Sequence, residues 1–316
     1  MSRVSSLRSF IAFSLLTVVL LFSQAAHALT PKEVLGVVQQ LRSELEVMRG
    51  KIGAPKSNLK SLPVIGVKPR EVFFQAESLE LKIVDLVAEQ TGQHKQPLLM
   101  IPKGKITPGH VFKVLESALK LLREGKQAMG VSGQGPSYPV PAKVTPTDVY
   151  KALILAHQQI NRMLKVKILP SDVFQRVEQV INYTHAVNGY LGKDVEHPLE
   201  KLDLSRKPSE VYTRLLSTFR QMRVALTAAG FSVLDLAPDA KAQPGTVPGD
   251  VYDLASLLLT EISMAYFAIP NRPLTPAVYY AGPKKPQHVY QIVGRLEHQL
   301  KDLQALVKLS GGKLKP

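Results

Sequence analysis

The chain contains no cysteine, and this absence removes several kinds of structure and chemistry at once. There can be no disulfide framework, no thiolate metal site, no cysteine nucleophile and no lipid-modified N-terminal cysteine. Long apolar runs are also scarce, because only the stretch from Phe10 to Phe22 is almost uniformly apolar. A membrane-spanning helix needs about 20 such residues, more than this run provides. We therefore expect no transmembrane span in the mature protein.

The N-terminal residues have the layout of an export signal. Arg3 and Arg8 form a basic start, the apolar run follows, and the small-residue sequence "AHA" ends at Ala28 as a cleavage site. An uncleaved signal that acts as an anchor is the alternative. We predict a signal peptide over residues 1–28 and a periplasmic or secreted mature protein that begins at residue 29.

Acidic residues are outnumbered, since 40 lysines and arginines face 25 aspartates and glutamates for a formal charge of +15. Arg3 and Arg8 leave with the predicted signal peptide. The remaining positive charge favours an acidic protein or an anionic envelope component, such as lipid head groups or cell-wall polymers, as the partner. No run of five or more basic residues occurs, so a general role in solubility explains the charge more simply, and nucleic acid is not an expected partner.

Catalytic signatures are missing as well. The chain has neither a Gly-Xaa-Ser-Xaa-Gly elbow nor a phosphate-binding Gly-Xaa-Xaa-Xaa-Xaa-Gly-Lys loop. None of its histidines forms a His-Xaa-Xaa-Xaa-His or Glu-Xaa-Xaa-His pair, the spacings that would place two metal ligands on one helical face. We therefore expect no enzyme, no catalytic residues, no metal and no cofactor.

What the chain does have is a hexapeptide repeated eight times, of which "TPTDVY" at residues 145–150 is one copy. Proline suits the first position of a helix, and the acid two residues later can accept hydrogen bonds from free backbone N–H groups there. In two copies His110 and His288 take the place of this acid. Valine comes next in every copy and begins an apolar stripe with helical spacing. We predict helices that begin at Pro31, Pro69, Pro108, Pro146, Pro170, Pro208, Pro248 and Pro286.

The spacing of these prolines indicates a duplication. Successive prolines are 38, 39, 38, 24, 38, 40 and 38 residues apart, so one short step separates two similar sets of four. Such a period is typical of arrays built from equivalent units. The predicted fold is all-α, with eight long helices in two tandem four-helix halves, residues 29–166 and 167–316. The sequence leaves open whether the halves are separate domains or share one core.

Glycine and proline residues predict where the helices end and what conformation the links adopt. Glycines that can close a helix stand about 22 residues after several of the prolines, which corresponds to helices roughly 33 Å long. The links contain proline and aliphatic residues, so we expect extended, ordered segments that lie along the helices. They are long enough to return the chain to its starting end, and parallel and antiparallel order both remain open. The glycines are Gly53, Gly92, Gly130, Gly192 and Gly230.

An aromatic residue follows the valine in seven of the eight copies. Packing of the helix ends is the favoured explanation. The functional alternative is a pocket for a small apolar or aromatic molecule. Its candidate ligand-binding residues are Tyr150, Tyr212, Tyr252 and Tyr290, together with His157 and His298, which stand at similar depth in the last helix of each half.

Two functions are compatible with these observations. The first is an exported, non-catalytic helical-repeat scaffold that binds a protein or an anionic envelope component. The second is a periplasmic ligand-binding or sensory bundle for a small molecule. A cavity larger than about 300 Å³ at the aromatic ends would favour the second function.

Overall fold

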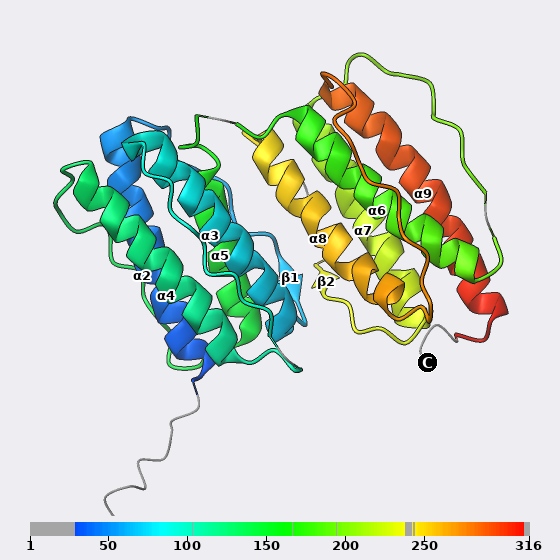
Figure 1. The fold of residues 1–316 in the computed structure, drawn as a ribbon, viewed down its shortest axis with the longest axis horizontal. Helices are drawn as coiled ribbons and strands as arrows, with labels where there is room; N and C mark the ends of the chain where they lie inside the picture. The colour runs from blue at the N-terminus through cyan, green and yellow to red at the C-terminus, as the bar shows by residue number, and fades with distance from the viewer. Residues whose placement is uncertain are drawn as a thin grey trace, which may run out of the picture.

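The computed structural model describes residues 29–312, except residues 103, 166, 194, 238–241 and 243. The predicted signal peptide lies outside the described residues. The predicted all-α fold is confirmed, and every predicted helix begins at its proline (Figure 1). The helices are α2 (Pro31–Ile52), α3 (Pro69–Thr91), α4 (Pro108–Ala128), α5 (Pro146–Ile160), α6 (Pro170–Tyr190), α7 (Pro208–Ala228), α8 (Pro248–Phe267) and α9 (Pro286–Leu309).

The helix starts share one capping hydrogen bond. In all eight helices, the side chain two residues after the proline accepts a hydrogen bond from the backbone N–H of the residue that precedes the proline. The distances are 2.7 to 3.1 Å. His110 and His288 do so through Nδ1, which confirms their predicted capping role. The threonines contribute less than we expected, because among them only the Thr145 hydroxyl accepts from the third helical residue.

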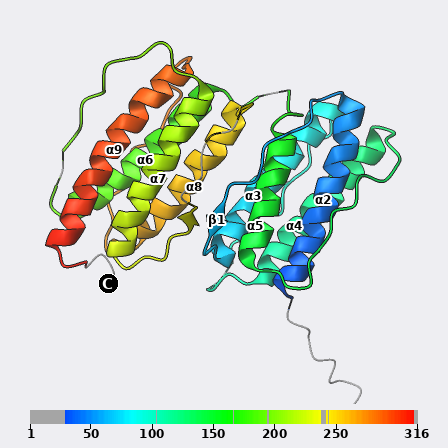
Figure 2. The same ribbon diagram turned by 180° about the vertical axis from the view of Figure 1, so that it is seen from behind.

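The four helices of each half run in the same direction. Their four starts surround one small cavity, lined in the first half by the prolines and valines of α2 to α5 and in the second half by those of α6 to α9. Figure 2 shows the resulting bundles, in which each link returns the chain to its starting end. The parallel alternative is therefore confirmed, and all eight valines are buried, as the stripe predicts.

Both halves have the same helix order. In the first half, α2 and α3 each pack against α4 and α5. In the second half, α6 and α7 each pack against α8 and α9. The first and second helix of each half thus lie diagonally across the bundle. This shared topology agrees with the duplication that the proline spacing indicates.

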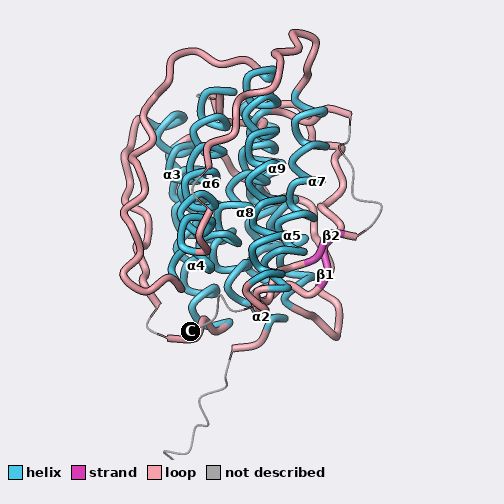
Figure 3. Tube along the Cα trace, turned by 90° about the vertical axis from the view of Figure 1, so that its right-hand side faces the viewer, coloured by secondary structure: helices cyan, strands magenta, loops and turns pink. Residues whose placement is uncertain are grey.

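The two halves point in opposite directions, and α8 lies against α3 and α5 (Figures 1 and 3). Asn161, just after α5, contacts Asp250 at the start of α8, whereas Arg70 at the start of α3 contacts Glu261 near the end of α8. The helix α5 has 15 residues and is shorter than we expected. The chain turns after Ile160 and brings the Asn161 side chain to α8.

A short antiparallel sheet, which the sequence did not predict, also joins the halves. The strand β1 (Val64–Ile65) of the α2–α3 link pairs with β2 (Asp235–Leu236) of the α7–α8 link. The extended links supply the strand conformation, and only the assembled halves bring these distant segments together. No helix in the described part of the chain is both long and apolar enough to cross a membrane.

Candidate functional site

A cluster of buried polar side chains, here called the joint, lies where α8 packs against α3 and α5. Lys82 of α3 donates to Asp253 at 2.6 Å and to the side-chain oxygen of Asn161 at 2.7 Å. The Asn161 amide donates to Asp253 at 3.0 Å and to Asp250 at 3.2 Å. Because Asp250 is also the capping acid of α8, the repeated helix start supplies part of the contact between the halves.

His157 lies at the same joint and is almost fully buried. Its Nε2 is 3.0 Å from the carbonyl oxygen of Gln75, and its Nδ1 is 3.8 Å from Asp253. Burial and the nearby Lys82 lower the pKa of His157 to about 4, against the opposing effect of Asp253. Burial alone would raise the pKa of Asp253, but Lys82 and His157 hold it below its ordinary value. At neutral pH the joint therefore contains a carboxylate paired with Lys82 and an uncharged imidazole.

The predicted site residues Tyr150 and Tyr212 also meet at the joint, where they border one cavity together with Asp250 and Asp253. Burial raises the pKa of both tyrosine hydroxyls, which stay protonated. The cavity measures about 20 Å³, enough for about one water molecule. Ligand sites of drug-like size begin at about 300 Å³. The structure thus brings three of the predicted residues together in a place without room for such a ligand.

A second group of charged residues lies at the other end of the contact between the halves, where the start of α3 meets the end of α8. Arg70 of α3 lies 2.5 Å from Glu71 and 3.1 Å from Glu261 of α8, and it donates to the carbonyl oxygen of Ser232 at 2.8 Å. Burial raises the pKa of Glu261 to about 8, with Arg70 opposing this shift and Glu71 adding to it. Glu261 is therefore mostly protonated at neutral pH.

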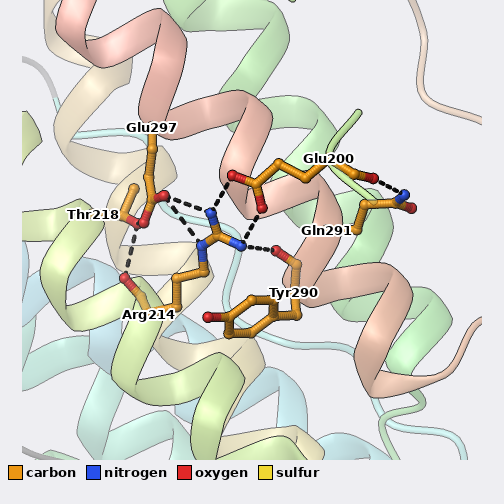
Figure 4. A network of polar contacts seen from close by, with 6 residues as sticks. All are labelled: Glu200, Arg214, Thr218, Tyr290, Gln291 and Glu297. Carbon is orange, nitrogen blue, oxygen red and sulfur yellow. Dashed lines mark hydrogen bonds and ion pairs between the residues drawn. The ribbon is translucent and has the colours of Figure 1, made fainter. Parts of the chain in front are cut away.

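Tyr290 belongs to a different network in the second half (Figure 4). Arg214 of α7 pairs with Glu200 of the α6–α7 link at 2.8 Å and with Glu297 of α9 at 2.7 Å. It also donates to the carbonyl oxygen of Tyr290 at 2.9 Å. The guanidinium groups of Arg206 and Arg214 lie 4.3 and 4.4 Å from the centre of the Tyr290 ring. This network fastens a link and α9 to α7.

The remaining predicted residues lie elsewhere. The Tyr252 ring is covered by the guanidinium of Arg176, which also donates to its hydroxyl. His298 stacks on His197 with ring centres 5.4 Å apart, and His197 lies 2.7 Å from Asp302. The four tyrosines and two histidines therefore do not form one site.

Two larger pockets lie beside links. A pocket of about 450 Å³ lies between α2, α4 and the α4–α5 link, which contributes Tyr138. Another of about 340 Å³ lies between α6, α9 and the α8–α9 link, which contributes Tyr279 and Tyr280. The cavities at the two sets of helix starts measure about 10 and 20 Å³. None of the predicted site residues lines either of the larger pockets.

The joint and the Tyr290 network are arranged to hold elements together. Within the described residues, no three His, Asp or Glu side chains come together as a metal site would require. The sequence did not predict the roles of Lys82, Asp253 and Arg214. Isolated charges inside apolar helices, such as Glu261 in "LLLTEIS", are the signal that indicates buried pairs of this kind. A scan against protein-family models finds no match to the chain, and searches among curated proteins and solved structures find none either.

Proposed function

We propose that the protein is an exported, non-catalytic helical scaffold that binds an anionic component of the cell envelope. The observation that carries the proposal is the contrast between a filled interior and a strongly basic surface. The cavities at the helix starts and at the joint are about 10 to 20 Å³, too small for a ligand. Binding is therefore assigned to the outside of the molecule.

The surface is more basic than the formal charge indicates. Among the described residues, 18 lysines and arginines are exposed, whereas only 5 aspartates and glutamates are. The other described acids are at least partly buried, and several of them cap helices or pair with basic residues, such as Asp250, Asp253 and Glu297. Exposed positive charge of this kind attracts anionic surfaces, and salt weakens that attraction.

Binding to isolated envelope material tests this proposal. The mature protein, with its N-terminus first established by mass spectrometry, is mixed with envelope fragments and sedimented at low and high salt. We expect it to sediment with the fragments at low salt and to be released progressively as salt increases. Absence of binding, or binding that salt leaves unchanged, would overturn the proposal.

The alternative, a small-molecule binding or sensory protein, is supported by the two link pockets. Their volumes of about 340 and 450 Å³ reach the size of ligand sites. Both pockets contain exposed or half-buried tyrosines that offer a planar apolar surface. A small molecule that purifies with the protein would favour this function over the scaffold.

A further inference from the structure

Two links place large apolar side chains in solvent. In the α3–α4 link, residues 92–107, Leu99 and Ile101 are 85% and 92% exposed. In the α8–α9 link, residues 268–285, Leu274 and Tyr279 are 95% and 78% exposed. Single exposed apolar residues are common in proteins, but two strongly exposed apolar residues on each of two links point to a binding surface.

The same two links are basic and contain no acid. Lys95 and Lys105 flank the apolar residues of the first, and Arg272 and Lys285 flank those of the second. The α6–α7 link contrasts with them, because its residues include four acids: Asp194, Glu196, Glu200 and Asp203. Each of the two links thus combines exposed apolar side chains with positive charge.

Two acids beneath these links contact the link or line the pocket under it. Glu80 of α3 accepts a hydrogen bond from the backbone N–H of Leu98 at 3.1 Å. Glu178 of α6 lines the pocket under the α8–α9 link. Burial raises the pKa of both carboxyls.

Both links lie on one side of the molecule, here called the link face. The first crosses α3 and α4, where Lys95 pairs with Glu124 of α4 at 3.2 Å. The second crosses α6, where Asn182 donates to the carbonyl oxygen of Pro276 at 3.3 Å. In Figure 1 both links run in front of these helices, and Figure 3 shows α3, α4 and α6 at one edge of the molecule with link segments outside them.

We infer that the link face docks on the surface of an anionic lipid bilayer. Leucine, isoleucine and tyrosine side chains enter the boundary between head groups and acyl chains, while lysine and arginine contact the anionic head groups. A protein partner would require a continuous complementary patch of about 800 Å². The apolar tips instead stand on separate links of the two halves, and a lipid surface accepts separate tips without a matching shape. This inference rests on the proposed envelope scaffold and specifies its anionic component.

Vesicle sedimentation tests the inference. The mature protein is mixed with vesicles of phosphatidylcholine alone or of phosphatidylcholine with phosphatidylglycerol, at low and moderate salt. We expect binding to the anionic vesicles only. The double variants Leu99→Ser with Ile101→Ser, and Leu274→Ser with Tyr279→Ser, should each weaken this binding by about tenfold, as expected for the loss of partly inserted apolar side chains.

Leu204→Ser and Leu309→Ser are the matched controls, since these leucines are 74% and 85% exposed but lie outside the two links. Both controls should bind anionic vesicles as the unchanged protein does. Circular dichroism is used to check that every variant keeps its helices. Equal binding by the link variants, equal losses in the controls, or equal binding to neutral vesicles would overturn the inference.

The envelope experiment separates this inference from the proposed function. Salt-sensitive binding to whole envelope fragments without binding to anionic vesicles would overturn the lipid surface as the partner and leave the scaffold proposal standing. In that case a cell-wall polymer or an acidic protein supplies the negative charge. Failure in both experiments would overturn the proposed function itself.

Discussion

Glu261 makes the stability of the contact between the halves depend on pH. Its pKa is about 8, compared with an ordinary value of 4.5, mainly because the side chain is buried. A carboxyl with a raised pKa in the folded state contributes stability fully below its unfolded pKa and loses this contribution as pH rises through its folded pKa. We therefore expect Glu261 to destabilise the fold progressively from pH 4.5 to about 8.

His157 has the opposite effect at lower pH. Its pKa is lowered from 6.5 to about 4, so its contribution is complete above pH 6.5 and is lost as pH falls towards 4. The two residues therefore compensate each other below pH 6.5, and Glu261 can be measured separately above it. One pH unit corresponds to at most about 1.4 kcal/mol for one proton, so the loss between pH 6.5 and 8 is at most about 2 kcal/mol.

Urea unfolding followed by circular dichroism measures this loss in the unchanged protein and in Glu261→Gln. The amide keeps the uncharged state at every pH, so the variant should lose up to about 2 kcal/mol less over this range. Burial raises the pKa of Glu77 to about 7, but Glu77 titrates in both proteins and cancels in the comparison. Glu210→Gln is the control, because capping contacts lower the pKa of Glu210 and place its titration below the range. The same pH dependence in all three proteins would refute a buried, protonated Glu261.

Three further predictions concern the architecture. Val149→Asp or Val211→Asp should unfold its half, because each valine is buried and an unpaired charge would replace it, and retained helicity and melting temperature in both variants would contradict this packing. Arg214→Lys should lower the free energy of unfolding by about 1 to 3 kcal/mol, because lysine cannot pair with two carboxylates through one planar group, and an unchanged urea midpoint would argue against the network. Residues 29–166 and 167–316, expressed separately, should each melt cooperatively because each contains a full set of four helices, and absence of both transitions would show a shared core.

The helix starts could be predicted because their signals are local. Proline, the capping acid and the buried valine act within one turn of helix, and this turn forms in the same way in all eight copies. The direction of the helices could not be predicted, since the links are long enough for either order. In the structure, the four valines of each half lie around one cavity at the helix starts, and this arrangement requires the four helices to be parallel.

The candidate site was predictable only in part. Tyr150, Tyr212 and His157 were predicted to share a site and do lie at one joint, but His298 and the other two tyrosines lie apart from it. The pairing of Lys82 with Asp253 joins residues 171 positions apart, so it depends on how the two halves pack. No spacing rule within one helix contains this information. The pairing of β1 with β2 is hidden from the sequence for the same reason.

Native mass spectrometry of the mature protein purified from its own cell envelope, with denaturing mass spectrometry beside it, tests the scaffold function most directly. A filled interior predicts a native mass equal to that of the bare polypeptide, or one that includes bound lipid, polymer or a second polypeptide. A single small apolar or aromatic compound, present at one copy for each chain and lost on denaturation, would contradict the scaffold and identify the protein as a ligand-binding bundle.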